Sequence, residues 1–533
     1  MNILIGGAWP YANGPLHIGH IAGLLPGDIL ARYYRAKGDT VFYVSGTDCH
    51  GTPICIKAKK ENKSPQEICD EYHNEFTDVF NRLGFSYDLY GKTTEQWHKD
   101  FVTEFHKQLY KSKFVYEKDS PQAYCNHCEK PLTDRLVTGI CPVCDNETNG
   151  EQCDACGNVT DAGNLKEAKC SECGNPVSYY NAKHLYIAIS KLEEQLKDYL
   201  NKHNDWRNNA IAFTKRYIDE GLRDRAITRD LEWGIKVPKE GYEDKRIYIW
   251  AENVLGYLSA SKVLCDKRNI PFDDLWKNDS RHYYVHGKDN IPFHTIILPS
   301  LLLAHNQGYH LPDDIISNEH LTLEGRKIST SKNWAIWAKD IVKEYSPDTI
   351  RFFLVANGPE KRDTDFTWSE FAERNNSELL GIYGNFVNRT LLFIKKYQYN
   401  IVPKGIADEE IQKIINDTYA NAGKNIENGR LKEALQEVIS LVRYGNKYYD
   451  TKEPWKTRTS NIEDCDNTIF NCTQIIANAA VLFRPFIPFS SDKVLSWLDL
   501  SYDWEIKKVK EGYTLPEISI LFERITIPSQ PQP

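Results

Sequence analysis

Methionine is nearly absent from this chain. Among 533 residues, Met1 is the single methionine, so leucine and isoleucine must take the core positions that methionine can fill in other proteins. No run of about eighteen apolar residues occurs, so we expect no membrane-spanning helix and no membrane partner. The first residues, MNILIGGAWPY, lack a basic stretch followed by an apolar one, so we expect no secretory signal and a cytoplasmic location.

An excess of positive charge is also missing. Sixty-six lysines and arginines stand against 74 aspartates and glutamates, which gives a formal net charge of -8. This balance excludes a general basic coat for nucleic-acid binding, although a local basic groove remains compatible with it. A length of 533 residues is too great for one ordinary core, so we expect roughly three or four structural units.

Cysteine is plentiful, but its pattern is not that of a disulfide framework. Eight of the fourteen cysteines form four C-x-x-C pairs, and the other six are scattered. Two such pairs can present four thiolates to one ion, a tetrahedral set that suits zinc. A redox dithiol needs only one pair, and iron–sulfur clusters, which stay possible, usually have a closer run of cysteines. The predicted metal ligands are Cys125, Cys128, Cys141, Cys144, Cys153, Cys156, Cys170 and Cys173.

Eight thiolates are enough for two closed metal sites. Because neither site keeps an open coordination position, both ions should be structural rather than catalytic. Spacing alone leaves the pairing open. Consecutive pairing joins 125/128 to 141/144 and 153/156 to 170/173, whereas nested pairing joins 141/144 to 153/156 inside and 125/128 to 170/173 outside.

The N-terminal segment predicts a strand, a glycine-rich turn and a helix. "NILIGG" has the pattern of a buried strand, and residues 21–36 carry apolar groups at helical spacing before Gly38. Pro26 weakens the prediction of one uninterrupted helix. In such units an anion binds at the carboxyl end of the strand, against the helix N-terminus. His17 and His20 lie at this junction and could both donate hydrogen bonds to a phosphate.

A second candidate phosphate-binding loop lies far downstream, in "LEGRKISTSKNWAIW". Residues 327–332 hold two lysines and three hydroxyl side chains, which can bind a polyphosphate through charge and hydrogen bonds. Taken alone, this segment would more simply be a solvated surface turn. The histidine turn and this loop together support phosphate binding more strongly than either segment alone.

Together these segments resemble the paired signatures of class I aminoacyl-tRNA synthetases. Within that class, "PYANGPLHIGH", "GTDCHGTPI", the cysteine pairs and "GKDNIPFH" resemble the methionyl-tRNA synthetases in content and order, over nearly the whole chain. The resemblance implies an α/β fold, in which a Rossmann-like catalytic domain is split by a zinc-knuckle connective domain and followed by an α-helical bundle that binds the anticodon.

The resemblance also implies domain boundaries. The catalytic halves would span 1–115 and 246–315, and the connective domain 116–245, with its knuckles at about 124–175. A stem-contact region with the KISTSK loop would span 316–370, and the helical anticodon-binding domain 371–533.

The implied activity is that of a methionine–tRNA ligase. Such an enzyme activates methionine with ATP to methionyl-adenylate and transfers the methionyl group to the 3'-terminal adenosine of tRNA(Met), for initiation and elongation of translation. The implied partners are therefore tRNA(Met), ATP and methionine, with Mg²⁺ accompanying ATP and two structural Zn²⁺ ions. The chain lacks the additional C-terminal module that some relatives use for dimerisation, so we expect a monomer.

The family's functional positions can be carried over one by one. Predicted catalytic residues are His17, His20, Lys327 and Lys332. Predicted ATP-binding residues are His17, Gly19, His20, Gly287, Lys288, Asp289, Lys327 and Thr330, with Asp289 at the ribose. Predicted methionine-binding residues are Trp9, Tyr11, Asp48, Trp250, Tyr257 and His294, where rings suit a thioether and Asp48 suits the ammonium group. Predicted anticodon residues are Asn385, Arg389 and Trp455, able to read a base edge or stack on a base.

Some positions depart from the family pattern. Thr330 replaces the second lysine of the mobile loop and Lys332 follows it, so either lysine could contact pyrophosphate. Asn253 and Val254 replace the Ala and Pro of many relatives, so the pocket wall should differ. Relatives with fewer cysteines keep either the inner or the outer set, which favours nested metal pairing.

Other functions compete with this one. Enzymes that charge leucine, isoleucine or valine usually carry a large editing insert, and none fits here. An enzyme that charges cysteine would place zinc at the substrate thiol, whereas these cysteines form a separate insert. A zinc-ribbon nucleic-acid-binding protein without catalysis would not need two nucleotide loops.

Overall fold

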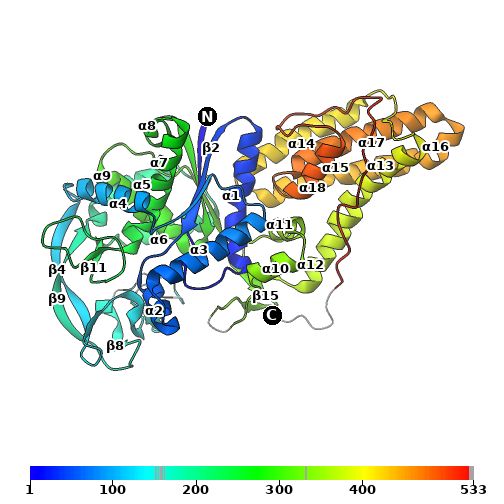
Figure 1. Ribbon diagram of the computed structural model, residues 1–533. Helices are drawn as coiled ribbons and strands as arrows, with labels where there is room; N and C mark the ends of the chain where they lie inside the picture. The colour runs from blue at the N-terminus through cyan, green and yellow to red at the C-terminus, as the bar shows by residue number, and fades with distance from the viewer. Residues whose placement is uncertain (151–152, 154, 157–159, 161, 331–332, 527–533) are drawn as a thin grey trace.

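The computed structural model describes residues 1–150, 153, 155–156, 160, 162–330 and 333–526. An α/β lobe surrounds a parallel sheet, and a bundle of long helices extends from one side of it (Figure 1). The predicted α/β class with a split Rossmann-like domain, a cysteine-rich insert and a helical C-terminal part is confirmed. In the described part of the chain, no helix combines the length and apolar character needed to cross a membrane.

The central sheet has five parallel strands in the order β14-β13-β1-β2-β3. Their bounds are Asn2–Gly7 for β1, Thr40–Thr47 for β2, Leu89–Lys92 for β3, Ser280–Gly287 for β13 and Asp314–Asn318 for β14. The apolar run of β1 is fully buried because helices cover both faces of the sheet. The chain proceeds to one side of β1 first and to the other side later, so a ligand crevice is expected at the carboxyl ends of β1 and β13.

Helix α1 (Ile18–Ala36) starts three residues earlier than the sequence pattern predicted, and it passes through Pro26 without a break. Proline lacks the N–H that would bond to the carbonyl of Ala22, and the side-chain amide of Asn318 donates to that carbonyl instead, at 2.8 Å. The helix ends at Ala36, Lys37 is its C-cap, and Gly38 follows with φ of 84°. The doubt raised by Pro26 is therefore resolved by a residue nearly three hundred positions away.

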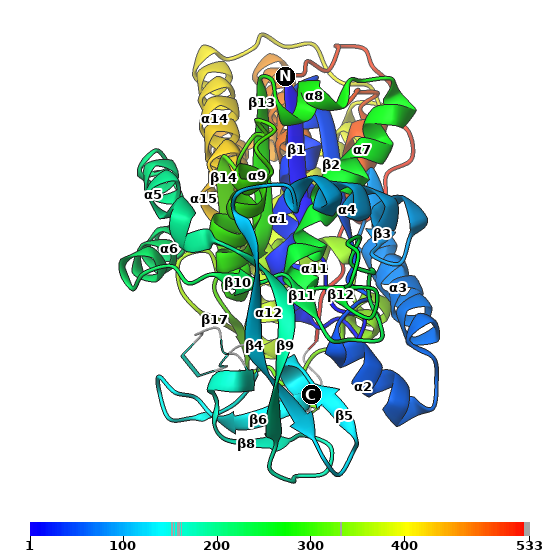
Figure 2. The ribbon, with the colours of Figure 1, turned by 90° about the vertical axis from the view of Figure 1, so that its left-hand side faces the viewer.

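Further helices and a long insert complete the α/β lobe. The helices are α2 (Thr52–Glu61), α3 (Pro65–Arg82), α4 (Gln96–Leu109), α7 (Gly256–Arg268), α8 (Phe272–Trp276) and α9 (Leu298–His305). The insert contains β4 (Val115–Cys125), β5 (Lys130–Leu132), β6 (Val137–Ile140), β7 (Glu147–Asn149), β8 (Lys166–Cys170), β9 (Ser178–Ile187), α5 (Glu193–Asn201), α6 (Asn208–Asp219), β10 (Arg225–Ala226), β11 (Thr228–Arg229) and β12 (Arg246–Ile247). Strands β4 and β9 pair along their length and lead to the small sheet that contains β6 and β8 (Figure 2).

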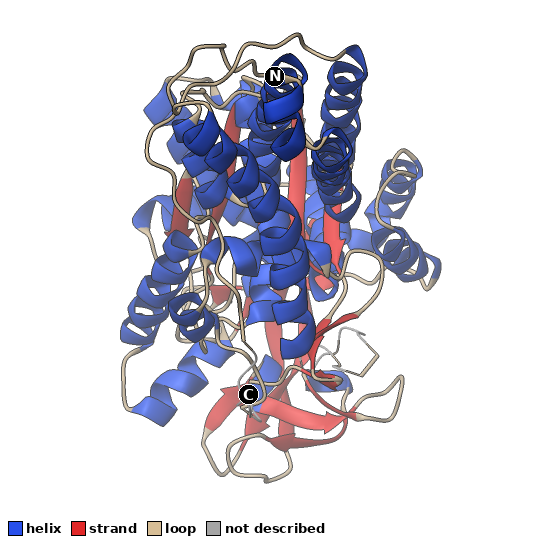
Figure 3. Cartoon of the chain, turned by 90° about the vertical axis from the view of Figure 1, so that its right-hand side faces the viewer, coloured by secondary structure: helices blue, strands red, loops and turns tan. Residues whose placement is uncertain are grey.

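The remaining elements form a small sheet region and the helical bundle. The first comprises β15 (Leu321–Leu323), β16 (Arg326–Lys327), α10 (Ala338–Glu344), α11 (Pro347–Ala356), β17 (Thr364–Phe366) and α12 (Trp368–Arg374). The bundle comprises α13 (Asn385–Tyr397), α14 (Glu409–Glu427), α15 (Leu431–Lys452), α16 (Pro454–Ser460), α17 (Ile462–Phe483) and α18 (Pro488–Trp497). Figure 3 views the molecule from the bundle's side, where long amphipathic helices pack on one another.

One buried arginine joins three parts of the molecule. Arg351 of α11 has no exposed side-chain surface and binds Asp28 of α1 at 2.7 Å. Its other donors reach the carbonyls of Leu83, Pro485 and Phe486 at 2.9 to 3.2 Å, and the last two belong to the turn before α18. Burial alone would raise the pKa of Asp28, but Arg351, a second arginine and a serine hold that pKa below its usual range.

We predict that Arg351→Leu lowers the free energy of unfolding by about 3–5 kcal/mol, because it removes one of the two arginines that bind the buried Asp28 carboxylate and also removes the donor to three carbonyls. The difference in free energy of unfolding between the variant and the natural protein should become smaller as the pH falls through the acid range. The reason is that a carboxyl whose pKa is lowered in the folded state no longer stabilises the fold once it is protonated. Urea unfolding followed by circular dichroism measures both effects. The matched control is Arg82→Leu, whose ion pair with Asp78 is exposed and should contribute less than about 1 kcal/mol. An equal loss of unfolding free energy in the two variants would contradict the stabilising role of the buried Arg351.

Candidate active site and metal centres

A cleft of about 520 Å³ lies at the carboxyl ends of β1, β2 and β13. Its walls come from the turn between β1 and α1, the segment before α7, the turn after β13 and the loop after β14. It brings together thirteen of the residues predicted for ATP and methionine, namely Trp9, Tyr11, His17, Gly19, His20, Asp48, Trp250, Tyr257, Gly287, Asp289, His294, Lys327 and Thr330. Residues more than three hundred positions apart therefore share one cavity.

His17 and His20 form the N-terminal cap of α1. The Nδ1 atom of His17 accepts from the N–H of Gly19, and the Nδ1 atom of His20 accepts from the N–H of His17, each at 3.1 Å. Burial, and for His17 also the neighbouring His20, lowers the pKa values to about 2 and about 4. A neutral imidazole that accepts at Nδ1 carries its proton at Nε2. The two stacked rings, with centroids 3.7 Å apart, thus keep their Nε2–H donors for a ligand.

One predicted ATP-binding residue, Lys288, is not among those lining the cleft. The ammonium group of Lys288 binds Glu319 and Asp363, each at 2.8 Å. Lys288 therefore joins the end of β14 to the residue before β17, and the structure does not bring it to the cleft. Lys332 lies outside the described residues.

The indole of Trp9 fits between two glycines. A Cβ atom added to Gly46 would lie 2.5 Å from this ring, and one added to Gly256 would lie 2.7 Å from it. Either position therefore needs glycine for Trp9 to occupy its place in the wall. On the same side of the cleft, the ring of Trp250 meets Phe293 edge to face, with centroids 4.5 Å apart.

Tyr257 and His294 make a fixed polar pair in this otherwise aromatic wall. Burial lowers the pKa of His294 to about 4, so its ring is neutral. Its Nδ1–H donates to the carbonyl of Asn290 at 2.9 Å, which leaves Nε2 to accept from the Tyr257 hydroxyl at 2.8 Å. The pair orients both rings.

The structure also adds cleft residues that the sequence patterns did not assign. Among them are His286, Asn290, Phe293, Glu319 and His320. His286 precedes the "GKDN" turn after β13, and Glu319 and His320 directly follow β14. Their position at the carboxyl ends of parallel strands was the signal that could have identified them.

The predicted anticodon residues lie on the bundle, away from the cleft. Arg389 on α13 binds Asp450 at 2.8 Å, and its guanidinium lies 4.2 Å from the ring centroid of Tyr449. Trp455 on α16 is 42% exposed, and its ring centroid is 5.8 Å from that of the same tyrosine. The structure thus joins Arg389 and Trp455 through Tyr449, while Asn385 lies exposed one turn before Arg389.

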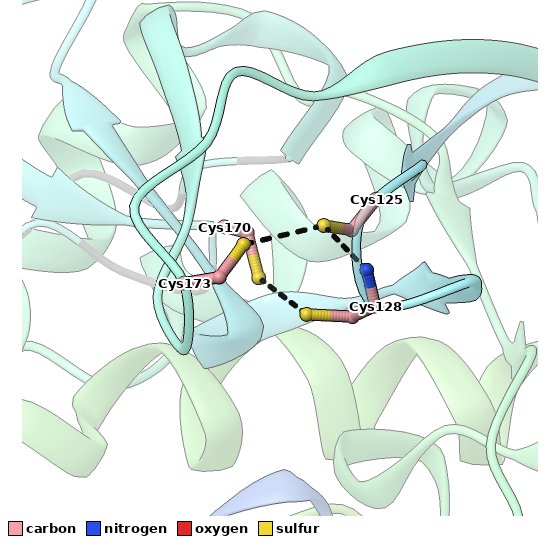
Figure 4. Close-up of side chains that lie close together, drawn as sticks. All are labelled: Cys125, Cys128, Cys170 and Cys173. Atoms are coloured by element: carbon pink, nitrogen blue, oxygen red, sulfur yellow. Dashed lines mark hydrogen bonds between the residues drawn. The ribbon is translucent and has the colours of Figure 1, made fainter.

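The eight paired cysteines form two groups in space. In each group the four sulfur atoms lie within 4.8 Å of one another. The outer group joins Cys125 and Cys128 to Cys170 and Cys173 (Figure 4). The inner group is Cys141, Cys144, Cys153 and Cys156, so nested pairing is confirmed.

The sulfur spacing suits a tetrahedral metal ion. The closest sulfur pairs across each group are 3.5 and 4.0 Å apart in the outer group and 3.6 and 3.9 Å apart in the inner group. A tetrahedron of thiolates with zinc–sulfur bonds of about 2.3 Å has edges of about 3.8 Å. Both groups could therefore hold a metal ion without rearrangement.

Two family models and two curated relatives that match this chain belong to the tRNA synthetases of the methionyl type. A family described as "tRNA synthetases class I (M)" matches residues 3–391, and one described as "Anticodon binding domain of methionyl tRNA ligase" matches residues 402–528. Methionine–tRNA ligase 1 of Alkaliphilus oremlandii (strain OhILAs) is 51% identical over 528 residues, covering 98% of this chain and 97% of the relative. Methionine–tRNA ligase of Bacillus cereus (strain Q1) is 50% identical, covering 99% of this chain and 97% of the relative.

A solved structure shares the whole fold. The methionyl-tRNA synthetase of Mycobacterium tuberculosis bound by methionyl-adenylate superposes with a TM-score of 0.81, covering 98% of this chain and 100% of that one. At 20% sequence identity, this likeness concerns the fold alone.

Metal analysis of paired substitutions tests the nested grouping. Cys125→Ser with Cys170→Ser removes two ligands from one group, so metal content should fall from two ions per chain to one. Cys125→Ser with Cys141→Ser damages both groups and should leave none. Consecutive pairing predicts the reverse, with no metal ion in the first double variant and one in the second. Atomic emission spectroscopy of the purified proteins measures the metal content. Cys265→Ser in α7, outside both groups, is the control.

Proposed function

The chain belongs to the class I tRNA synthetases of the methionyl type, and from this premise we propose how its residues carry out the reaction of a methionine–tRNA ligase. The observation that carries the proposal is the single cleft that collects the histidine turn, the loop after β14 and an aromatic pocket with one carboxylate. The substrates would be ATP, methionine and tRNA(Met).

His17 and His20 would bind the triphosphate as neutral donors through their Nε2–H groups. The dipole at the start of α1 adds to the attraction for phosphate. Lys327, which lines the same cleft, would supply positive charge, with Lys332 as the second candidate, and Mg²⁺ bound to ATP would supply more. Gly19 leaves space here, because a Cβ atom would lie 3.0 Å from the His17 ring.

The remaining nucleotide contacts would come from the turn after β13. Gly287 allows a close approach of the nucleotide, and the exposed carboxylate of Asp289 would accept from the ribose hydroxyls. Lys288 would act indirectly, by holding this turn against Glu319 and Asp363.

The first half-reaction joins methionine to AMP. A carboxylate oxygen of methionine attacks the α-phosphorus, and the bond from that phosphorus to the bridging oxygen breaks, so pyrophosphate leaves with the electron pair. In the second half-reaction a hydroxyl of the 3'-terminal adenosine attacks the carbonyl carbon, and AMP leaves. Neither step needs a covalent enzyme intermediate, so catalysis consists of positioning and of stabilising the leaving charge.

Methionine would lie in the aromatic part of the cleft. Trp9, Tyr11, Trp250, Tyr257 and His294 present rings to the soft, apolar thioether. Asp48 would bind the ammonium group.

The outlying parts would bind tRNA and metal. Asn385, Arg389 and Trp455 would bind the unpaired anticodon bases by hydrogen bonding and stacking. Two Zn²⁺ ions would hold the insert together at the two cysteine groups, in closed sites with a structural role. We propose a monomer as the active form.

Amino-acid-dependent exchange between ATP and pyrophosphate tests the reaction. Methionine should drive the exchange, whereas leucine, isoleucine, valine and cysteine should not drive it at comparable concentrations. Faster exchange with one of these four would identify a sibling enzyme, and no exchange with any amino acid would favour the non-catalytic alternative.

We predict that His17→Ala and His20→Ala each slow adenylate formation about 100-fold or more while leaving methionine affinity nearly unchanged. Each substitution removes a donor that acts mainly on the charge of the transition state. Rapid-quench measurement of the single-turnover rate gives the first quantity, and equilibrium dialysis gives the second. His127→Ala, an exposed histidine in the insert, is the control. Single-turnover rates near that of the natural protein would refute the phosphate role.

We predict that Trp455→Ala leaves pyrophosphate exchange intact and reduces tRNA charging by about tenfold or more, since stacking of one base contributes about 1–3 kcal/mol. The two assays on one preparation separate these effects. Ile462→Ala, another exposed apolar residue of the bundle, serves as the matched control. Equal loss in both assays would speak against the anticodon assignment.

A further inference from the structure

Two pairs of side chains link the segment after β2 to the segment before α7. The side-chain amide of Asn253 donates to Oδ2 of Asp48. Two residues further along the first segment, His50 hydrogen bonds to Glu252, the residue before Asn253. The pairs connect positions about two hundred residues apart, and both carboxylates are almost fully buried.

This arrangement fixes the orientation of the Asp48 carboxylate. Its Oδ2 atom accepts from Asn253, and its Oδ1 atom accepts from the backbone N–H of His50 at 3.3 Å. The backbone N–H of Asp48 itself donates to the carbonyl of Pro10 at 2.8 Å. With one donor on each oxygen, the carboxylate cannot rotate freely, and its remaining lone pairs are available in the cleft that Asp48 and Asn253 both line.

We propose that Asn253 is a positioning residue for amino-acid binding, which orients the Asp48 carboxylate toward the ammonium group of the substrate. The buried His50–Glu252 pair holds the segment that carries Asn253. This inference rests on the proposed function, because that function assigns the ammonium group to Asp48.

The charges around Asp48 show why such a donor is needed. Burial raises the pKa of Asp48 well above its usual range, and the nearby Glu252 raises it further. The hydrogen bonds from His50 and Asn253 act in the opposite direction. Cys69 of α3 also faces this carboxyl and raises its pKa slightly, while His98 of α4 reaches it only through Glu252.

The consequence of losing the amide follows from these signs. Without Asn253 the pKa of Asp48 rises further, and a larger fraction of the carboxyl is protonated at a given pH. A protonated Asp48 attracts an ammonium group much less strongly. The loss of affinity should therefore be confined to ligands that carry an ammonium group, and it should become larger as the pH falls.

The test is Asn253→Ala, which removes the side-chain amide that donates to Asp48. In pyrophosphate exchange, KM for methionine should rise about tenfold or more, as expected for a lost hydrogen bond to a charged group, while kcat changes by less than about twofold. The inhibition constant of the methionine analogue that lacks the amino group should also change by less than about twofold. The acid limb of kcat/KM for methionine should move to higher pH. Asn253→Asp, which places a second carboxylate beside Asp48, should raise KM more and lose part of that defect at lower pH.

Two further variants make the result decisive. Val254→Ala changes the adjacent lining residue without touching a hydrogen bond, so it should affect methionine and the analogue equally. Asp48→Asn should abolish the advantage of methionine over the analogue. If it does not, the ammonium role of Asp48 in the proposed function is wrong. If Asp48→Asn removes that advantage but Asn253→Ala leaves KM unchanged, or weakens both ligands equally, the inference about Asn253 alone is overturned.

Discussion

The position of helix α1 is the constraint on which the cleft, the sheet and the bundle depend. Its first turn carries the two histidines that cap it and face the cleft. Further along, Pro26 is accommodated because Asn318 of β14 takes the free carbonyl, and Asp28 is bound by the buried Arg351. Each contact removes a polar group from an otherwise unsatisfied state, so the helix has one low-energy position rather than several.

The far end of α1 meets the bundle. Tyr33 donates to Glu427 of α14 at 2.7 Å, and the carbonyl of Ala36 accepts from the N–H of Trp504 at 2.9 Å. Arg351 adds a second link, through the carbonyls before α18. A rigid helix of 19 residues therefore runs from the bundle to the turn that would hold the triphosphate. The bundle and the cleft therefore share this element.

The cleft relies on oriented dipoles more than on permanent charge. His17, His20 and His294 are neutral, and in each ring the hydrogen bond at Nδ1 sets the tautomer. Because such donors are already oriented, little reorganisation is needed when negative charge develops on a leaving group. Charge enters from the loop that carries Lys327 and from the single buried carboxylate of Asp48, whose orientation depends on its own donors.

The sequence by itself determined the local features of this protein. The apolar run of β1, the histidine turn, the downstream lysine loop and four cysteine pairs are short patterns whose physics involves few neighbours, and they led to the class of fold and reaction. Tertiary structure decided what depends on distant partners. Spacing could not choose nested over consecutive cysteine pairing, and it could not reveal that Asn318 allows α1 to continue through Pro26, that Lys288 is taken by Glu319 and Asp363, or that Asn253 binds Asp48. Each of these outcomes is a pairing between segments that only packing brings together, so no local pattern can encode it.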